Sequence, residues 1–230
     1  MTTIREQLQT VRHRLGSACE EAGRRPESIK LLAVSKTRPA EAVRAAQAAG
    51  QVDFGENYVS EALEKMQALA DLRGRIHWHL IGPLQANKTR SVAEAFDWVH
   101  SVDRLRIAQR LSEQRPAHLA PLQLCLQVNI SGEASKSGVA PADLPALAVA
   151  VSHLPRLHLR GLMAIPAPAQ GLAAQRAPLA ALRGLLEALK NQSGLRLDTL
   201  SMGMSADLEA AVLEGATLVR IGTAIFGSRP

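Results

Sequence analysis

The chain has 230 residues, of which 47% are apolar and 21% are charged, and 27 Lys and Arg against 21 Asp and Glu leave a formal charge of +6. The apolar fraction is enough for one sizeable core, and together with the modest charge it excludes a chain that is mainly disordered. Three Phe, two Trp and one Tyr are too few for a base-stacking nucleic-acid surface. We therefore expect a single domain over residues 1–230.

The cysteines and the apolar runs indicate the cellular compartment and exclude some kinds of partner. No stretch approaches the ~18 apolar residues of a membrane span. Cys19 and Cys125 lie far apart without further Cys or His at ligand spacing, so no zinc module is expected. These features predict a cytoplasmic protein with two reduced, buried thiols and no metal or membrane partner. Lys and Arg are scattered singly, so we expect no nucleic-acid partner either.

The predicted elements begin with an amphipathic helix at residues 2–22, where Ile4, Leu8, Val11 and Leu15 recur at three- and four-residue steps. Short runs rich in Val, Ile and Leu then alternate with helical stretches. The short runs predict strands at residues 29–35, 52–56, 76–81, 98–102, 122–129, 157–165, 199–202 and 218–221. The longer stretches predict helices at residues 39–49, 59–70, 87–96, 104–114, 142–153, 172–190 and 205–213.

Eight strands that alternate with helices, in a chain close to the ~250 residues typical of the fold, predict an α/β protein: a closed (β/α)8 TIM barrel with an extra N-terminal helix. An open doubly wound sheet is the structural alternative. It would need a glycine-rich turn of the form G-x-G-x-x-G, and the sequence has none. Residues 164–179, rich in Pro and Ala, predict an extended loop before the long helix.

The reactive groups of such a barrel come from the carboxyl ends of its strands. The first strand leads to Lys36, which shares the face of Val34 because side chains alternate along a strand. A lysine at the rim of an apolar barrel loses hydration, so its neutral amine can condense with a carbonyl. A rim lysine in an ordinary salt bridge is the alternative.

The second and third strands carry polar side chains as well. Asn57 follows the second strand and offers a ligand both a donor and an acceptor. His77 and His79 lie on one face of the third strand, a spacing that a metal could use. No third ligand lies near them in the sequence. We therefore expect a hydrogen-bonded core histidine and, for His79, packing against or hydrogen bonding to a ligand ring.

The loops after the seventh and eighth strands are small and polar. Ser201, Gly222 and Thr223 can supply hydroxyl and backbone N–H donors, which suit a phosphate monoester. Ser205 is placed to cap the helix at 205–213, whose free N–H groups could face an anion. Two ordinary turns and a helix cap are the alternative.

Arg220 alternates with Leu218 and Gly222, so it should point into the barrel with them. A buried guanidinium needs an acceptor, either an aromatic nitrogen of a bound cofactor or a carboxylate in a buried ion pair. A lysine at one strand end, a phosphate cradle at two others and an inward arginine together outline a pocket for pyridoxal phosphate.

Seven segments resemble the pyridoxal phosphate homeostasis protein family, and the resemblance spans nearly the whole chain. They are residues 33–37 (AVSKT), 54–58 (FGENY), 79–85 (HLIGPLQ), 135–138 (SKSG), 161–163 (GLM), 200–205 (LSMGMS) and 219–227 (VRIGTAIFG). The resemblance implies a fold-type III barrel, similar to the N-terminal domain of alanine racemases, that holds pyridoxal phosphate as a Schiff base on Lys36. It also implies that Ser201, Gly222 and Thr223 hold the phosphate and that Arg220 lies near the pyridine nitrogen.

The residues and the resemblance together predict a set of cofactor-binding residues and no established catalytic residue. The set is Lys36, Asn57, His79, Met163, Ser201, Gly203, Ser205, Arg220, Gly222 and Thr223. Family members are regarded as carriers or regulators of vitamin B6, so we expect a monomer that stores pyridoxal phosphate and delivers it, with PLP-dependent apoenzymes as the clients that this implies.

An arginine beside the ring nitrogen disfavours its protonation and mutes carbanion chemistry. The sequence also leaves no residues for the second domain that supplies a tyrosine in racemases of this fold. A weak amino-acid racemase or another Schiff-base enzyme is the alternative, and a basic nucleic-acid-binding module is the third interpretation.

Overall fold

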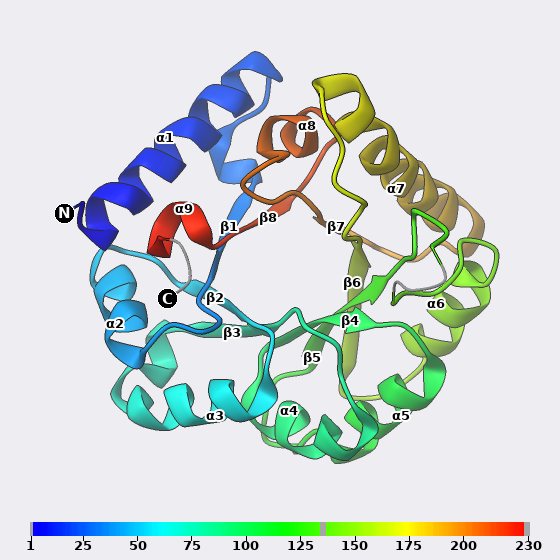
Figure 1. Cartoon of the computed structure of the whole chain (residues 1–230). Helices are drawn as coiled ribbons and strands as arrows, with labels where there is room; N and C mark the ends of the chain where they lie inside the picture. The colour runs from blue at the N-terminus through cyan, green and yellow to red at the C-terminus, as the bar shows by residue number, and fades with distance from the viewer. Residues whose placement is uncertain (1, 134–136, 228–230) are drawn as a thin grey trace.

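A computed structural model describes residues 2–133 and 137–227, and its eight strands form a closed parallel barrel in chain order (Figure 1). The last strand pairs in parallel with the first, which closes the barrel. The predicted (β/α)8 architecture is thereby confirmed. The strands are β1 (Lys30–Val34), β2 (Asp53–Glu56), β3 (His77–Leu80), β4 (Trp98–Val102), β5 (Leu122–Gln127), β6 (Leu157–Met163), β7 (Thr199–Ser201) and β8 (Leu218–Ile221).

Helices surround this barrel. The described α-helices are α1 (Ile4–Glu21), α2 (Ala40–Ala48), α3 (Val59–Ala68), α4 (Thr89–Ala95), α5 (Leu105–Gln114), α6 (Leu144–Ser152), α7 (Leu172–Ser193), α8 (Leu208–Leu213) and α9 (Thr223–Phe226). Short 3₁₀ turns, η1 (Pro26–Ser28), η2 (Ala70–Arg75) and η3 (Ala86–Lys88), precede β1, β3 and α4. The 3₁₀ helices, of three to six residues, and the four-residue α9 are too short to show a hydrophobic period, so the sequence did not predict them.

The extra N-terminal helix, α1, completes the ring of helices. It begins with a capping box between Thr3 and Glu6 and buries Leu8, Val11 and Leu15. Because α9 is so short, a full-length helix after β8 is missing from the described chain. Helix α1 packs against α2, α8 and α9 and covers this side of the barrel (Figure 1).

Two predictions of local structure are wrong. The loop expected at 164–179 overlaps the helix expected at 172–190, and the helix prediction is the correct one, because α7 begins at Leu172 and includes Pro178. The apolar face that α7 buries outweighs the single hydrogen bond that a proline removes. The expected cap by Ser205 is also absent, since α8 begins only at Leu208. Asp207 instead accepts a hydrogen bond from the N–H of Met204 through Oδ1.

The main core lies between the outer face of the strands and the helices. Within the described residues, the barrel interior contains two small apolar clusters, one of Leu32, Ile81 and Leu218 with Val34, and one of Trp98, Cys125 and Met163. Barrel interiors are ordinarily filled by bulky branched apolar side chains. Here five buried polar side chains share the space: Asp53, His79, His100, Ser201 and Arg220. Such a polar interior points to the site.

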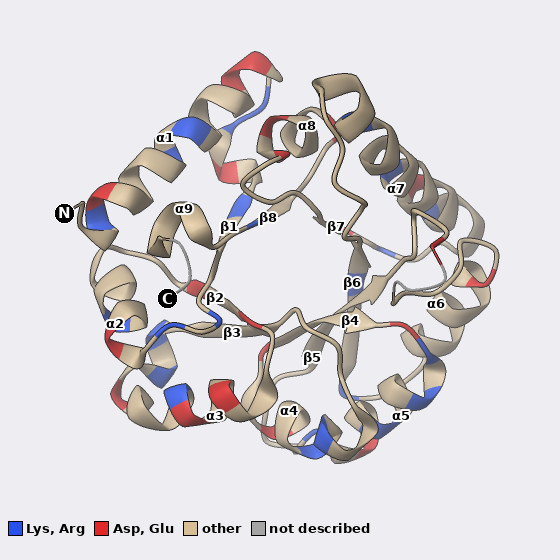
Figure 2. Ribbon diagram, viewed as in Figure 1, with Lys and Arg blue, Asp and Glu red and all other residues tan. Residues whose placement is uncertain are grey.

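The outer surface is of mixed charge. Figure 2 shows basic and acidic residues interspersed along the outer helices. Within residues 2–133 and 137–227, no helix combines the length and the apolar character needed to cross a membrane.

Candidate functional site

A cavity of about 300 Å³ opens at the carboxyl end of the barrel. Residues of β1 and β8 and of the segments that follow β1, β2, β3, β6, β7 and β8 form its wall. They are Val34, Lys36, Asn57, Ile81, Ile165, Met204, Ser205, Ala206, Arg220, Gly222 and Thr223. The volume lies at the lower end of the range for small-molecule sites, which is ~300–1,000 Å³. The cavity therefore suits a compact ligand rather than a polymer.

Lys36 reaches this cavity from β1. It lies two residues after Val34, and both side chains line the wall, as the alternation of side chains along a strand predicts. The intervening Ser35 points to the opposite side, where its Oγ donates to Glu56 Oε1 at 2.6 Å. Thr37, directly after the lysine, adopts a left-handed backbone conformation with φ of 61°. The chain thus turns sharply at the point where it presents the amine.

Arg220 forms part of the cavity floor and is 4% exposed. Its Nη1 donates to Ser201 Oγ and its Nη2 donates to the carbonyl oxygen of Ala164, each at 2.9 Å. Burial lowers the pKa of Arg220 to about 10, so the guanidinium remains charged at neutral pH. Neither of these partners is a carboxylate, so the contacts favour a ligand acceptor over the buried ion pair.

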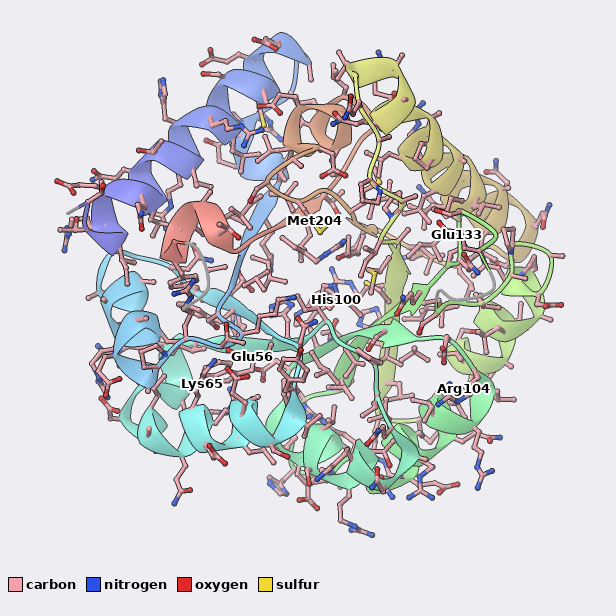
Figure 3. The ribbon with its side chains drawn as sticks, viewed as in Figure 1. Glu56, Lys65, His100, Arg104, Glu133 and Met204 are labelled. Carbon is pink, nitrogen blue, oxygen red and sulfur yellow. The ribbon has the colours of Figure 1, made fainter. Side chains whose placement is uncertain are left out.

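A chain of hydrogen bonds continues from Ser201 through the barrel. Its Oγ lies 2.8 Å from His100 Nδ1, and His100 Nε2 lies 3.0 Å from His79 Nδ1. His79 Nε2 in turn lies 3.0 Å from Asp53 Oδ1. His100 points into the middle of the barrel (Figure 3). The chain therefore joins the cavity floor to a carboxylate near the amino end of the barrel.

The direction of every hydrogen bond in this chain follows from the residue types. Burial lowers the pKa of His79, and it lowers that of His100 further, so both rings are neutral. Burial alone would raise the pKa of Asp53, but the hydrogen bond from His79 and the nearby positive charges outweigh it and leave that pKa lowered. An ionised carboxylate only accepts, so His79 Nε2–H donates to it and His79 Nδ1 accepts. His100 then donates through Nε2 and accepts the hydroxyl hydrogen of Ser201.

The loop between β7 and α8 forms the opposite wall. Gly203 has φ of +91°, and a Cβ there would lie 2.4 Å from Ala211 Cβ, so only glycine fits this turn. Its carbonyl accepts the backbone N–H of Arg220 at 2.9 Å. The next residue but one, Ser205, is held from outside by Arg14 of α1, whose Nη1 donates to the Ser205 carbonyl at 2.8 Å. Arg14 also forms a bidentate pair with Glu209 of α8.

The structure brings six of the ten predicted residues to the cavity. These are Lys36, Asn57, Ser205, Arg220, Gly222 and Thr223. Ser201 is fully buried and is not part of this wall; its Oγ accepts from Arg220 and lies 2.8 Å from His100 Nδ1. The other three also lie off the wall: His79 is fully buried and stacks on Trp98, Met163 packs in the barrel, and Gly203 shapes the loop.

Two residues of the site escaped prediction, although their strands carried the signal. His100 lies two residues after Trp98, and Asp53 lies two and four residues before Gly55 and Asn57. Residues at two-residue steps share one face of a strand, so this spacing alone would have placed both inside the barrel. Of the resembling segment 135–138, residues 135 and 136 lie outside the described residues. Among the described residues, no group of three or more His, Cys, Asp or Glu could hold a metal ion.

Comparison with known proteins gives a consistent result along the whole chain. Residues 7–230 match the family described as the alanine racemase N-terminal domain. The pyridoxal phosphate homeostasis protein of Pseudomonas aeruginosa is 65% identical over 229 residues, which cover 100% of this chain and 97% of that protein. The protein of the same name from Escherichia coli (strain K12) is 53% identical over 230 residues, which cover 100% of this chain and 98% of that protein.

Solved structures agree with these relatives. PipY of Synechococcus elongatus PCC7942, in a structure with PLP bound, has a TM-score of 0.86 and 42% identity, over 98% of this chain and 100% of PipY. The alanine racemase of Corynebacterium glutamicum has a TM-score of 0.70 and 18% identity, over 97% of this chain and 62% of the racemase. At that identity the racemase shows a shared fold and nothing more.

Proposed function

Because this chain belongs to the alanine racemase N-terminal domain family and, within it, to the pyridoxal phosphate homeostasis proteins, we propose that it binds pyridoxal 5′-phosphate (PLP) at the carboxyl end of its barrel and carries it on Lys36. The proposed role is to hold, buffer and deliver the cofactor. The single observation that carries the proposal is that Lys36, Arg220, Gly222 and Thr223 line one cavity of about 300 Å³.

The donor set of the cavity fits each end of the cofactor. PLP supplies an aldehyde, which an amine attacks, and a phosphate, which hydrogen-bond donors hold. Lys36 is the only lysine on the described wall and would be that amine. Bound PLP would supply an aldehyde with which the Lys36 nitrogen could condense, with loss of water. Exchange of that C=N bond to a second amine would free Lys36 and release the cofactor attached to that amine.

The phosphate would be held mainly by Ser205, Gly222 and Thr223. The last two open α9, where N–H groups have no partner inside the helix. A Cβ on Gly222 would lie 3.2 Å from the Val34 carbonyl oxygen, so a larger residue would crowd the wall beside Lys36. We assign no direct phosphate contact to the Ser201 hydroxyl, which acts through Arg220.

Arg220 is proposed to donate to the ring nitrogen of the cofactor. A permanent positive charge beside that nitrogen disfavours its protonation, and an unprotonated ring is a weak electron sink. Asn57 offers a further contact, since its buried Oδ1 accepts no hydrogen bond from the described residues and can take one from a ligand hydroxyl.

A carrier fits the cavity better than a racemase does. Racemisation needs an acid/base group on each face of the substrate. The described wall contains Lys36 and Arg220 and no Asp, Glu, His, Cys or Tyr. Tyr58, the one tyrosine of the chain, is 58% exposed and lines a neighbouring hollow instead. The second proton-transfer group that a racemase requires is therefore missing from the described wall.

The proposal extends to location and assembly. Both cysteines are buried and unpaired, and burial raises the pKa of the Cys125 thiol to about 12, which suits the reducing cytoplasm. Of the six large apolar residues exposed in the described chain, Ile165 and Met204 line the proposed cofactor cavity, and the other four come from α6, α7 and the segments around β2, so we propose a cytoplasmic monomer. PLP-dependent apoenzymes would be its clients.

Absorption spectroscopy of the purified protein tests the proposed function. Added PLP should give the spectrum of a protein-bound Schiff base that borohydride bleaches. Incubation with alanine or serine, followed by chiral analysis, should show turnover no faster than that of free PLP. Turnover well above that level would replace the carrier with an enzyme.

A further inference from the structure

A buried cluster of charges lies behind Lys36, on the side of β1 that faces α3. It consists of Ser35, Glu56, Glu61 and Lys65, and we refer to it as the Lys65 cluster. Lys65 Nζ donates to Glu56 Oε1 at 2.8 Å, to Glu61 Oε1 at 2.6 Å and to the Ser35 carbonyl at 2.6 Å. Lys65 of α3 and Glu56 of β2 lie side by side in Figure 3. The three donors of the ammonium are thus all in use.

The cluster grips the backbone on both sides of Lys36. Before the lysine, the Ser35 carbonyl accepts from Lys65 and the Ser35 hydroxyl donates to Glu56. After it, the N–H of Thr37 donates to Glu61 Oε1 at 2.5 Å. Glu61 Oε1 therefore accepts from both Lys65 and Thr37. The two peptide units that set the direction of the Lys36 side chain are tied to the same group of charges.

The backbone held in this way is one that the chain would not adopt alone. Thr37 has φ of 61°, in the left-handed region that a β-branched residue avoids. Such a conformation is unfavourable for an isolated chain and persists only where the surroundings impose it. Two contacts hold it here: the bond from the Thr37 N–H to Glu61 Oε1, and the turn bond from the Arg38 N–H to the Ser35 carbonyl at 3.1 Å.

Stability gives no reason for the cluster. Lys65 is 6% exposed and Glu56 is fully buried, and taking such charges out of water costs about as much as their pairing returns. Glu56 Oε2 has no hydrogen-bond partner among the described residues. Burial raises the pKa of Glu56, although Lys65 counteracts this. Apolar side chains of similar volume often replace such a buried pair without loss of stability, so stability alone does not account for the cluster.

We propose that Glu61 and Lys65 are positioning residues that hold the Ser35–Thr37 backbone in the conformation from which the Lys36 amine reaches the aldehyde. This inference rests on the proposed function, which makes Lys36 the reacting amine. It predicts an effect on the rate of bond formation, because misplacement of a reacting group by 1 Å can slow a reaction ~10²-fold. It predicts no effect on contacts made by the phosphate.

Glu61 is the residue to change, because its side chain is 27% exposed and its loss should be tolerated. Glu61→Ala removes the acceptor for Thr37, whereas Glu61→Gln keeps an oxygen that can accept from both Thr37 and Lys65. Lys65→Met is the more disruptive variant, because it would leave the buried Glu56 without its lysine partner. Asp71→Ala is the matched control, since it removes a carboxylate from an exposed pair with Arg44 outside the Lys65 cluster.

Two measurements separate positioning from general damage. Stopped-flow absorbance should show Schiff-base formation slowed at least about tenfold in Glu61→Ala. Glu61→Gln should stay near the wild-type rate, and Asp71→Ala should equal it. Pyridoxine 5′-phosphate, which has no aldehyde and cannot form the bond, should bind the wild type, Glu61→Ala, Glu61→Gln and Asp71→Ala with the same affinity.

An unchanged rate in Glu61→Ala, or an equal loss in its affinity for pyridoxine 5′-phosphate, would overturn the positioning role while leaving the proposed function intact. Failure of Glu61→Gln to restore the rate would also count against it. Wild-type protein that forms no borohydride-trapped bond would refute the proposed function first, and the positioning role with it.

Discussion

The two ends of the barrel contain hollows of similar chemistry. The hollow at the carboxyl end, of about 300 Å³, is lined by Lys36, Arg220 and the hydroxyls of Ser205 and Thr223. The hollow at the amino end, of about 220 Å³, is also lined by a lysine, an arginine and hydroxyls, from Lys30, Arg160, Ser28, Thr199 and Thr217. Composition alone would not tell which of them binds a ligand.

Their charges are paired differently. At the amino end, Lys30 lies 3.6 Å from Asp53, and Arg160 forms a bidentate pair with Asp198 at 2.5 and 2.9 Å. Both cations also lie over the ring of Trp98, at 5.8 and 5.1 Å from its centroid. The described wall at the carboxyl end includes no carboxylate. The two hollows therefore differ in their walls: a carboxylate, Asp198, lies on the wall at the amino end, and none lies on the described wall at the carboxyl end. The difference teaches that the charges on a hollow must be judged with the counter-charges built beside them, and not by their number.

Replacement of the lysine at each end should give the largest contrast. Lys36→Ala should abolish the absorption spectrum of the protein-bound Schiff base, because no other lysine lines the described cavity. Lys30→Ala, its counterpart at the amino end, should leave that spectrum unchanged. Titration of both variants with PLP in the absorption spectrometer checks this. A spectrum that survives in Lys36→Ala but disappears in Lys30→Ala would exchange the roles of the two hollows.

The two arginines sharpen the comparison further. Arg220→Ala should weaken PLP binding by roughly 10- to 150-fold, because a hydrogen bond to a charged group contributes ~1.5–3 kcal/mol. The spectrum of the bound PLP should also become dependent on pH, since the ring nitrogen can then be protonated. Arg160→Ala, at the opposite end, should change neither property. Equal effects of the two substitutions would mean that Arg220 acts on stability alone.

A smaller effect is expected at the phosphate. Thr223→Ala should weaken PLP binding about tenfold through loss of one hydroxyl contact to a charged group, while binding of pyridoxal, which lacks the phosphate, should not change. Thr199→Ala at the amino end serves as the control. Equilibrium dialysis of the two ligands provides the measurement. Parallel losses for PLP and pyridoxal would place the phosphate elsewhere.

The hydrogen-bond chain between the two ends should affect stability rather than binding. The pKa values of His79 and His100 are lowered by burial, so the folded state resists protonation that the unfolded state accepts below its pKa of ~6.5. Stability should therefore be complete above about pH 7 and fall toward pH 5, by up to ~1.4 kcal/mol per pH unit for each histidine.

Urea unfolding at a series of pH values measures this slope. His100→Asn should flatten it, and His118→Asn, at an exposed position in the loop before β5, should not. Wild-type stability that is the same at pH 5 and pH 7 would show that the buried rings are protonated in the folded state.

The fold was predictable because its signal repeats along the chain. Each of the eight strand–helix alternations supports the prediction of a barrel. Side chains two residues apart share one face of a strand, which was enough to place Lys36 and Arg220 inside the barrel. Local chemistry was less predictable. The expected cap by Ser205 is wrong because the carboxylate of Asp207 bonds to the N–H of Met204 and delays the start of α8.

The contacts of the site were hidden because they join residues remote in sequence. His100 and Ser201 meet across the barrel, 101 residues apart, at a height set by the stagger of the strands. No local pattern contains that stagger. The sequence likewise predicts Lys65 to be an exposed polar residue of a helix. It is buried because α3 packs against β1 and β2, which no local pattern shows.

The most direct test of the central claim is to reduce the complex of the wild-type protein and PLP with borohydride and to map the modified residue by peptide mass spectrometry. A stable secondary amine on Lys36, and on no other lysine in stoichiometric amount, is the predicted result. An adduct on Lys30, Lys65 or another lysine, or no adduct at all, would contradict it.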